Sequence, residues 1–392
     1  MLQKNKLMKS AIALSIIASS SLYATNGDTL IGVGAKTRAM GGAGIALSHG
    51  AESTLVNPAL ITKNKGTEIS FGGTFFMPTI KTQIDPNTAG KKIKSDADKS
   101  VIPAVAISSE IYPNLYMGVG MYGTAGMGTD FRGNPGLFDM ETTLQLMQFA
   151  VPVAYKYGNL SLGISPILQY GSLDINYKMG GATTGYGQKQ DFGFGVSVGA
   201  VYDFDNGFSI GAVYKSEIEM KYAKVLTTAA TPFGIPVGDT LTQPAEIGIG
   251  ISYTNGPHSI ALDYKKIKWG SAKGYKAFGW KDQNVIAIGY QYDAGIWSAR
   301  VGFNHATSPL TVGNNPAINM FNLLGFPATS KNHFTAGGTY NFSKNFSTDF
   351  TLVYSPKATT SASNLAGLGM GMTKITNTHS ELGATVQFNY KF

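Results

Sequence analysis

Polar and apolar residues alternate along most of this 392-residue chain. The C-terminal segment shows the alternation most clearly, with one apolar row and one polar row. The apolar row is Leu382, Ala384, Val386, Phe388, Tyr390 and Phe392, and the polar row is Glu381, Thr385, Gln387, Asn389 and Lys391. A period of two predicts β-strands with one apolar face. A charge on a lipid-facing position would cost about 2–4 kcal/mol, so the charged row should face inward.

Similar segments recur upstream and together predict about fourteen strands. They begin near residues 66, 98, 114, 141, 159, 189, 207, 240, 257, 281, 295, 331, 346 and 373. Short turns at 113–114, 158–159, 206–207, 255–257, 293–295 and 344–345 alternate with longer linkers at 82–98, 129–140, 178–189, 225–240, 270–280, 307–330 and 358–373. This is typical of an outer-membrane barrel with short periplasmic turns and long external loops. We predict an all-β fold, a 14-stranded antiparallel transmembrane β-barrel over residues 66–392.

The segment from Gly32 to Ala59 breaks the alternation, because it is rich in Gly and Ala and weakly helical. Asn57 suits a helix cap, and Pro58 suits the first helical position. The small side chains of residues 39–44 would allow close packing against a barrel wall. We predict that residues 25–65 form a small helical N-terminal hatch, or plug, in the barrel lumen. The alternative is a loosely ordered exported N-terminus.

Residues 1–24 contain three lysines, a short apolar run and a small-residue end, as a signal peptide does. A membrane anchor is the alternative, but the apolar run is short for a span. We therefore predict cleavage near Ala24 and export to the bacterial outer membrane. Charged residues make up only 14% of the chain, and there are 49 glycines, which suits a lipid-wetted barrel. No Lys/Arg cluster forms the extended basic face of a nucleic-acid-binding protein.

Two of the expected external loops contain many apolar residues, which usually mark a binding surface. We predict that they capture a hydrophobic molecule at the cell surface. The alternative is that the loops pack on each other and close the barrel mouth, and both descriptions can hold. The candidate residues are Phe233, Ile235, Phe321, Leu323, Leu324 and Phe326.

Several motifs resemble the FadL family of outer-membrane transporters for long-chain fatty acids and related hydrocarbons. RAMGGAG at 38–44 precedes an Asn-Pro-Ala step, and GVGMYGTAGMGTDFRG at 118–133 resembles the family's third strand and following loop. METTLQLMQFAVPVAYKYGNLSLGISP at 140–166 is similar to the fourth and fifth strands. LTQPAEIGIGISYTNGPHSIALDYKKIKW at 241–269 and WKDQNVIAIGYQYDAGIWSARVGFNHATSP at 280–309 are similar to the eighth to eleventh strands.

The resemblance implies a barrel closed by a hatch that shifts as the ligand moves, with sideways exit at a kink in the third strand. It assigns hatch gating to Met40, Gly41, Gly42, Asn57, Pro58 and Ala59. It places the kink and lateral opening at Gly123, Gly126 and Gly128, where glycines make a bulge inexpensive. Ordinary barrel curvature is the alternative explanation of these glycines.

A fatty carboxylate would need an internal cation, and we predict Lys281 or Arg300 in this role. Each of them could instead join a luminal network with Asp263, Asp349 or Glu381. The expected fifth strand (169–174) carries no basic residue for a second anchor. The substrate is therefore either a long-chain fatty acid or a neutral hydrocarbon.

We predict no enzymatic activity, because the five histidines show no nucleophile or metal-ligand spacing. The prediction includes no catalytic residue, no metal and no cofactor. The expected partners are a hydrophobic small molecule, outer-membrane lipid and the barrel assembly machinery, for a monomeric protein without nucleic acid. A non-specific porin or an adhesin is the alternative function, and planar-bilayer conductance would distinguish it from a plugged barrel.

Overall fold

The structure is a computed structural model that describes residues 25–392, so the expected signal peptide lies outside the described residues. The wall strands in chain order are β3 (Thr67–Asp85), β5 (Ser100–Tyr112), β6 (Leu115–Asp130), β7 (Glu141–Ala150), β8 (Val153–Tyr157), β9 (Leu160–Met179), β11 (Lys189–Asp203), β12 (Phe208–Lys215), β13 (Glu246–Asn255), β14 (His258–Ile267), β15 (Gln283–Asp293), β16 (Trp297–Ala306), β17 (Asn332–Asn341), β18 (Phe346–Ala362) and β19 (Lys374–Lys391). Short strands outside the wall are β1 (Thr25–Asn26), β2 (Thr29–Leu30), β4 (Ile93–Lys94) and β10 (Ala182–Gly185).

The helices are short. The α-helices are α2 (Ala35–Ala39), α3 (Val225–Ala230) and α4 (Pro316–Gly325), and the 3₁₀ helices are η1 (Gly50–Leu55), η2 (Pro58–Lys63), η3 (Pro135–Leu137), η4 (Thr231–Phe233) and η5 (Leu365–Leu368). Within residues 25–392, no helix has the length and apolar character that a membrane crossing requires.

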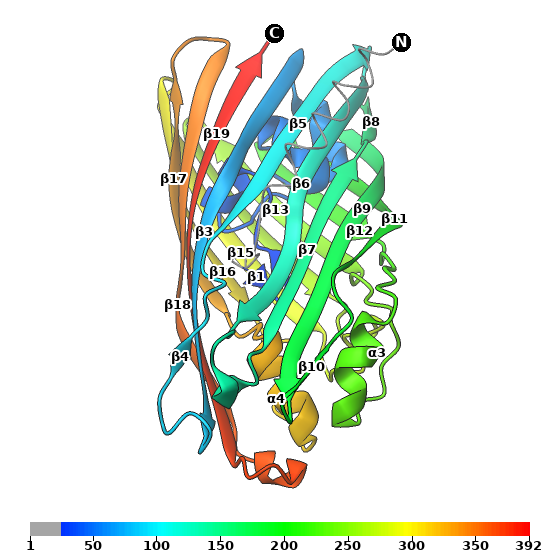
Figure 1. Cartoon of the computed structure of the whole chain (residues 1–392). Helices are drawn as coiled ribbons and strands as arrows, with labels where there is room; N and C mark the ends of the chain where they lie inside the picture. The colour runs from blue at the N-terminus through cyan, green and yellow to red at the C-terminus, as the bar shows by residue number, and fades with distance from the viewer. Residues whose placement is uncertain (1–24) are drawn as a thin grey trace, which may run out of the picture.

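The wall strands pair with their chain neighbours in antiparallel register, and β19 pairs with β3 to close the barrel. Because β7 and β8 pair with the same two neighbours, they count as one interrupted strand, and the wall has fourteen strands as predicted. All six short turns lie at one end, at the top of Figure 1, and we call it the turn end. The long linkers carry β4, β10, α3 and α4 at the other end, which we call the loop end.

One expected strand boundary is wrong. The eighth strand begins at Glu246 rather than near residue 240. The residues before it fold back on the first part of the same linker, because Thr240 pairs with Lys221 and Gln243 pairs with Ile218. The linker between β12 and β13 therefore forms a small ladder of its own instead of extending the wall.

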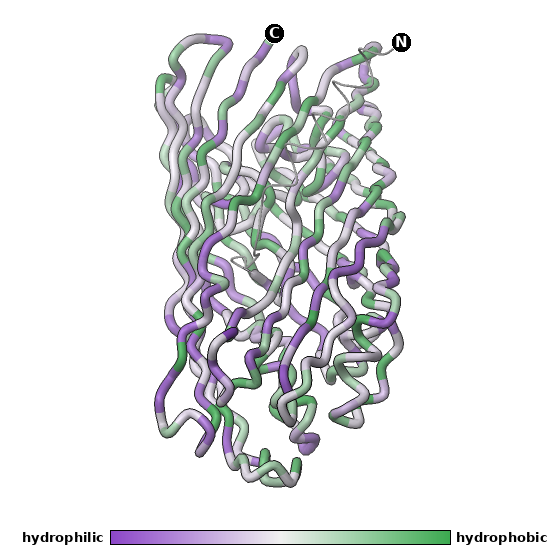
Figure 2. Tube along the Cα trace, viewed as in Figure 1, coloured by the Kyte–Doolittle hydropathy of each residue, from purple (hydrophilic) through white to green (hydrophobic). Residues whose placement is uncertain are grey.

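Alternation sorts the wall side chains as the sequence predicts. On β19, Leu382, Val386 and Tyr390 are exposed on the outer face, whereas Glu381 and Gln387 are buried inside. Figure 2 shows hydrophobic and hydrophilic residues interleaved along the wall strands. The inner polar row is buried because the N-terminal segment, residues 25–65, fills the lumen. Its α2 packs against β16 to β19, η1 against β3, β5 and β6, and η2 against β6, β8, β9 and β11.

Candidate functional site

Inward-facing glycines form the contact surface between the wall and the N-terminal segment. A Cβ atom added at any of nine wall glycines would lie closer than 3.0 Å to an atom of that segment, and these are Gly120, Gly163, Gly199, Gly211, Gly248, Gly250, Gly289, Gly302 and Gly337. Six of them oppose each other in cross-strand pairs: 163 with 199, 211 with 250, and 289 with 302. We call this set the glycine belt. Any larger side chain there would push the N-terminal segment off the wall.

The Met40–Gly42 turn fits against this belt. Gly41 and Gly42 have φ angles of +69° and +88°, which favour glycine. The Gly41 amide donates to Thr335 Oγ1 at 3.0 Å, and Asn304 Nδ2 donates to the Gly41 carbonyl at 3.0 Å. Met40 is fully buried against two alanines of the wall. The predicted hatch residues 40–42 are therefore a docking turn in the structure.

We expect Gly302→Val to displace the N-terminal segment, because its side chain would overlap the backbone of Met40 and Gly41. Ala299→Val is the matched control, since Ala299 lies on the same strand with its side chain on the exposed face. Limited proteolysis of residues 25–65 in reconstituted protein measures the effect. Cleavage should rise in Gly302→Val only, and equal resistance of both variants would contradict the belt's role.

Asn57 links the N-terminal segment to itself and to the wall. Its Oδ1 accepts from the Ala59 amide at 3.1 Å, so it caps η2 as the sequence predicts. Its Nδ2 donates to the Ile45 carbonyl at 2.8 Å and to the Ala212 carbonyl of β12 at 3.3 Å. The side chain is fully buried, and it lies where a Cβ of Gly199 would otherwise be.

Glu52 anchors the start of α2, whose cap residue Gly34 has no side chain to offer. Its carboxylate accepts from the amide and the hydroxyl of Thr37, both at 2.6 Å, and from the Lys36 amide at 3.2 Å. Gln387 of β19 donates to the same carboxylate at 2.8 Å. Glu52 was not predicted from the sequence, because its role depends on two segments meeting inside the lumen.

Asp263 of β14 is a second buried anchor. One of its oxygens accepts from the Gly44 amide at 2.7 Å and from the Ile45 amide at 2.9 Å. Hydrogen bonds to a charged group contribute about 1.5–3 kcal/mol each. Asp263 therefore holds the backbone of the N-terminal segment. It forms no ion pair with Lys281 or Arg300 among residues 25–392.

The predicted kink in the third strand is a β-bulge in β6. Pairing of β6 with β5 ends at Tyr122, and its pairing with β7 shifts between Gly123 and Ala125. Beyond the shift, Ala125 pairs with Thr29 of the β1–β2 hairpin. Every residue from 122 to 129 is buried, so this half of β6 turns into the lumen, where the hairpin takes the place of β5.

A side chain of β5 and the linker between β4 and β5 occupy the space between β5 and β6 in this structure. The Ile102 side chain of β5 lies where a Cβ of Gly123 would be. Nearer the loop end, the Asp130 amide donates to Ser95 Oγ at 2.9 Å, and the Ser95 amide donates to the Ile80 carbonyl of β3 at 2.9 Å. The linker between β4 and β5 thus joins β3 to β6 across the separation.

The candidate loop residues form a cluster that covers the loop end. Phe321 is fully buried and stacks on Phe278, with ring centroids 5.1 Å apart. Ile235, Leu323, Leu324 and Phe326 are also buried, and Phe233 is half-buried. The structure therefore shows the alternative arrangement, in which apolar loops pack on each other and close the mouth.

Two cavities lie beneath this cluster, on either side of Asp28. The first, about 20 Å³, is lined almost entirely by apolar side chains: Met127, Leu144, Leu173, Leu226, Leu241, Tyr275, Phe278, Trp280, Asn322 and Phe326. The second, about 80 Å³, borders residues 29–33, Thr124 of the bulge and Gln243. Asp28 accepts hydrogen bonds from Tyr275 of the first cavity and Gln243 of the second.

Burial raises the pKa of Asp28 to about 6, against hydrogen bonds from Tyr275, Gln243 and Thr29 that lower it. The docked hairpin thus holds a proton that a released, solvated Asp28 would lose near pH 4. Docking should be strongest below about pH 4 and weaken as the pH rises towards 6. Hydrogen exchange of the Gly126 amide, which donates to the Asp28 carbonyl at 3.0 Å, measures this after correction for intrinsic rates. Asp28→Asn should remove the dependence, and an unchanged pH profile in that variant would exclude Asp28 as its origin.

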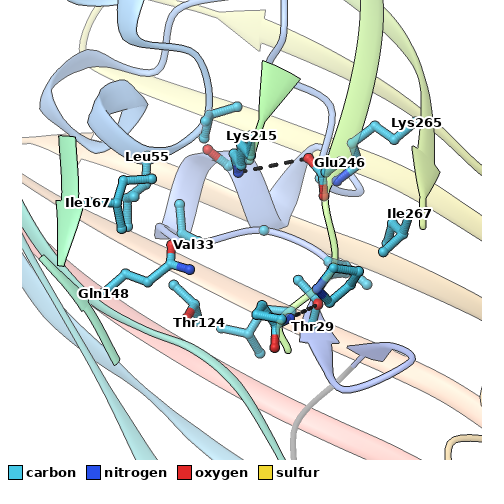
Figure 3. A pocket seen from close by; sticks show the side chains of 18 of the residues that line it. Thr29, Val33, Leu55, Thr124, Gln148, Ile167, Lys215, Glu246, Lys265 and Ile267 are labelled. Atoms are coloured by element: carbon cyan, nitrogen blue, oxygen red, sulfur yellow. Dashed lines mark hydrogen bonds and ion pairs between the residues drawn. The ribbon is translucent and has the colours of Figure 1, made fainter. Parts of the chain in front are cut away.

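The larger cavity is lined by both polar and apolar side chains (Figure 3). Lys215 and Lys265 lie near Glu246, and the Lys215 Nζ atom is 3.8 Å from Glu246 Oε1. Leu55 and Ile167 line the cavity farther from Glu246, together with Gln148. Thr124 Oγ1 and Gln243 Oε1 also reach this region without a hydrogen-bond partner among residues 25–392. Such a cavity suits a molecule with an apolar body and a polar end.

The two predicted carboxylate ligands lie at opposite ends of the barrel. Lys281 is exposed beside β15 at the loop end and lines neither cavity. Arg300 is buried near the turn end, where it donates to Gln291 Oε1 at 2.6 Å and to Thr339 Oγ1 at 2.7 Å. Thr339 in turn donates to Asp349 at 2.5 Å. Arg300 therefore belongs to a luminal polar network, which was the alternative. Lys215 and Lys265 were not among the predicted carboxylate ligands, although alternation places both side chains on the inner face.

Comparisons with known proteins agree with this architecture. A family described as outer membrane protein transport protein (OMPP1/FadL/TodX) matches residues 11–392. A 47 kDa outer membrane protein of Pasteurella multocida is 25% identical over 396 residues, covering 86% of this chain and 89% of the relative. A FadL homologue of Pseudomonas aeruginosa superposes with a TM-score of 0.73 at 15% identity, covering 93% and 100% of the two chains. The toluene transporter TodX of Pseudomonas putida gives 0.70 at 18% identity, covering 94% and 100%.

Proposed function

Because the chain belongs to the OMPP1/FadL/TodX family of outer membrane transport proteins, we propose that it carries a hydrophobic molecule inward across the bacterial outer membrane. The loop end faces the cell exterior, and the turn end faces the periplasm. One observation carries the proposal: an apolar loop cluster, a small apolar cavity, Asp28 and a larger amphipathic cavity follow each other towards the bulge in β6. A hydrophilic-solute porin would instead show rings of charge at an open constriction.

Capture begins in the loop cluster. A hydrophobic ligand separates the rings around Phe321 and then occupies the cavity below Phe278 and Trp280. That cavity is only about 20 Å³ in this structure, so the loops must open to admit a ligand. Because the contacts of these rings are apolar, a ligand of similar polarity can replace them.

The N-terminal segment acts as the hatch. Displacement of the β1–β2 hairpin breaks the hydrogen bonds of Asp28 and joins the two cavities into one path. The hairpin also leaves Ala125 of β6, so the bulge loses its inner partner. The ligand then exits sideways between β5 and β6, where the Ile102 side chain and the linker that carries Ser95 must move.

The substrate class follows from Lys215 and Lys265, which we propose as the head-group site in place of Lys281 and Arg300. Together they exceed the single Glu246 among the residues that line the cavity, so a carboxylate would be attracted there. The solved relative TodX is described as a toluene transporter, which makes a neutral aromatic hydrocarbon the competing substrate.

Binding and uptake with paired ligands test the proposal. The ligands are a long-chain fatty acid, the alcohol of equal length and toluene, and the proteins are wild type and Lys215→Met/Lys265→Met in reconstituted vesicles. For a carboxylate substrate, the variant should lose affinity for the acid about tenfold while its affinity for the alcohol stays constant. Equal losses for acid and alcohol would refute the head-group role. Large ohmic currents of the wild type in planar bilayers, without hydrophobic uptake, would refute transport through a hatch.

A further inference from the structure

Lysines that are far apart in the sequence meet on the outer surface at the loop end. They come from β3, β4 and β18, which adjoin through β19 at the lower left of Figure 1. The set comprises Lys81, Lys94 and Lys357, and we call it the rim lysines. All three are exposed.

Register shows that the rim lysines share the lipid-facing side of the wall. The pairing of β3 with β19 runs without a shift, so Lys81 lies on the same face as the exposed Phe71 and Phe75. Lys94 is directly opposite Lys81 and therefore shares that face. Lys357 lies in the bulge of β18 and is exposed, two residues before Thr359, which is in the same cross-strand row as Lys81.

The rim lysines lie just beyond the apolar surface of the wall. Tyr354, Leu382 and Met77 form one cross-strand row, in which Tyr354 and Leu382 are exposed. Lys357 follows Tyr354 by three residues, and Lys81 follows Met77 by four, both towards the loop end. In a barrel of this family, that level is the head-group region of the outer leaflet.

Charge around the rim lysines is not balanced locally. Lys94 Nζ is 2.6 Å from Asp98, whereas Lys81 and Lys357 form no ion pair within the part of the chain that the structure describes. Two ammonium groups directly opposite each other, as at 81 and 94, repel. An anion placed between them would relieve this repulsion.

We propose that the rim lysines bind the phosphate groups of an anionic glycolipid of the outer leaflet. Lysine suits this partner, because it contacts phosphate as a flexible point charge from an aliphatic stem that can lie along acyl chains. The site is separate from the transport path, since none of the three lysines lines either cavity. The lipid would fasten the edges of β3 and β18 at the barrel seam.

Lipid binding to the purified, folded barrel tests this inference in the presence of a chelator, which excludes bridging divalent cations. The probes are bisphosphorylated lipid A and the same lipid without phosphates, measured by native mass spectrometry. The test variant is Lys81→Gln/Lys94→Gln/Lys357→Gln. The matched control is Lys221→Gln/Lys276→Gln/Lys331→Gln, which removes equal charge from exposed loop-end positions elsewhere. Heat-dependent gel mobility confirms that each variant is folded.

We expect the test variant to lose affinity for the phosphorylated lipid about tenfold or more, while the control variant binds like wild type. The dephosphorylated lipid should bind weakly to all three proteins, and added salt should weaken only the specific binding. Equal binding by wild type and test variant, or equal binding of both lipids by wild type, would overturn the proposal.

Discussion

Oxidation of a Thr29→Cys/Ala125→Cys variant is expected to stop uptake almost completely, and reduction should restore it. Thr29 of the hairpin and Ala125 of the β6 bulge are directly opposed in antiparallel register. Side chains in such pairs lie about 4.5–5.5 Å apart at Cβ, close to the geometry that a disulfide needs. The chain contains no cysteine, so the engineered pair has no competing thiol. The covalent link would hold the hairpin on β6 and keep the two cavities apart.

A second cysteine pair controls for the effect of cross-linking itself. Thr254 and Ser259 are opposed across β13 and β14, and their hydroxyl oxygens are 3.0 Å apart. Neither residue touches the hairpin, so Thr254→Cys/Ser259→Cys should transport equally well oxidised and reduced. Uptake is measured with the same hydrophobic ligand before and after a reductant. If the oxidised hairpin pair transports at the wild-type rate, the hairpin is not the moving part.

Asn57→Ala is expected to slow uptake about fivefold or more while the barrel stays folded. The substitution removes the cap of η2, the donor to the Ile45 carbonyl and a longer contact to the Ala212 carbonyl of β12. Loss of such a cap alone costs about 0.5–2 kcal/mol, and leaving the buried Ile45 carbonyl unsatisfied adds about 1–3 kcal/mol. The hatch would then leave the glycine belt and no longer present its cavity to the arriving ligand.

Asn64→Ala is a useful comparison, because Asn64 is also buried and hydrogen-bonded to the wall, through Ser108 Oγ, but lies beyond η2. Uptake should fall less in Asn64→Ala than in Asn57→Ala, and heat-dependent gel mobility should show both barrels folded. Unchanged uptake in Asn57→Ala would refute the gating role of this residue. A fall of equal size in both variants would indicate general loosening of the hatch instead.

Strands and turns could be predicted from the sequence, because each depends on residues close in the chain. The alternation near Glu381 fixes which face is polar, and the turn residues fix where strands end. The predicted start of the eighth strand near residue 240 was wrong, because it depends on residues that are farther away in the chain. Residues 240 and 243 pair with Lys221 and Ile218 in the first part of the same linker, and a single sequence gives no signal for such a pairing.

The candidate site was predictable only where a role belongs to the local backbone. Asn57 caps η2 and the bulge lies at Gly123, as expected from short motifs. Lys281 was chosen because it adjoins Trp280, yet the two side chains differ in burial, since Trp280 is buried and Lys281 is exposed. Alternation predicts whether a side chain faces the lumen or the lipid. The depth of that side chain along the barrel axis depends on how neighbouring strands are staggered. Lys215 and Arg300 both face the lumen, but Lys215 lines the larger cavity whereas Arg300 lies near the turn end.

The pairing of β19 with β3 sets an order for biogenesis. The last strand of the chain is the partner of the first wall strand, so the cylinder cannot be sealed until the whole polypeptide is available. Residues 25–65 precede that first strand and end up enclosed. Entry of these residues into the lumen before β19 pairs with β3 avoids passing them through a closed barrel. Contacts between residues so far apart in the sequence form slowly. This delay allows residues 25–65 to enter the lumen before β19 pairs with β3.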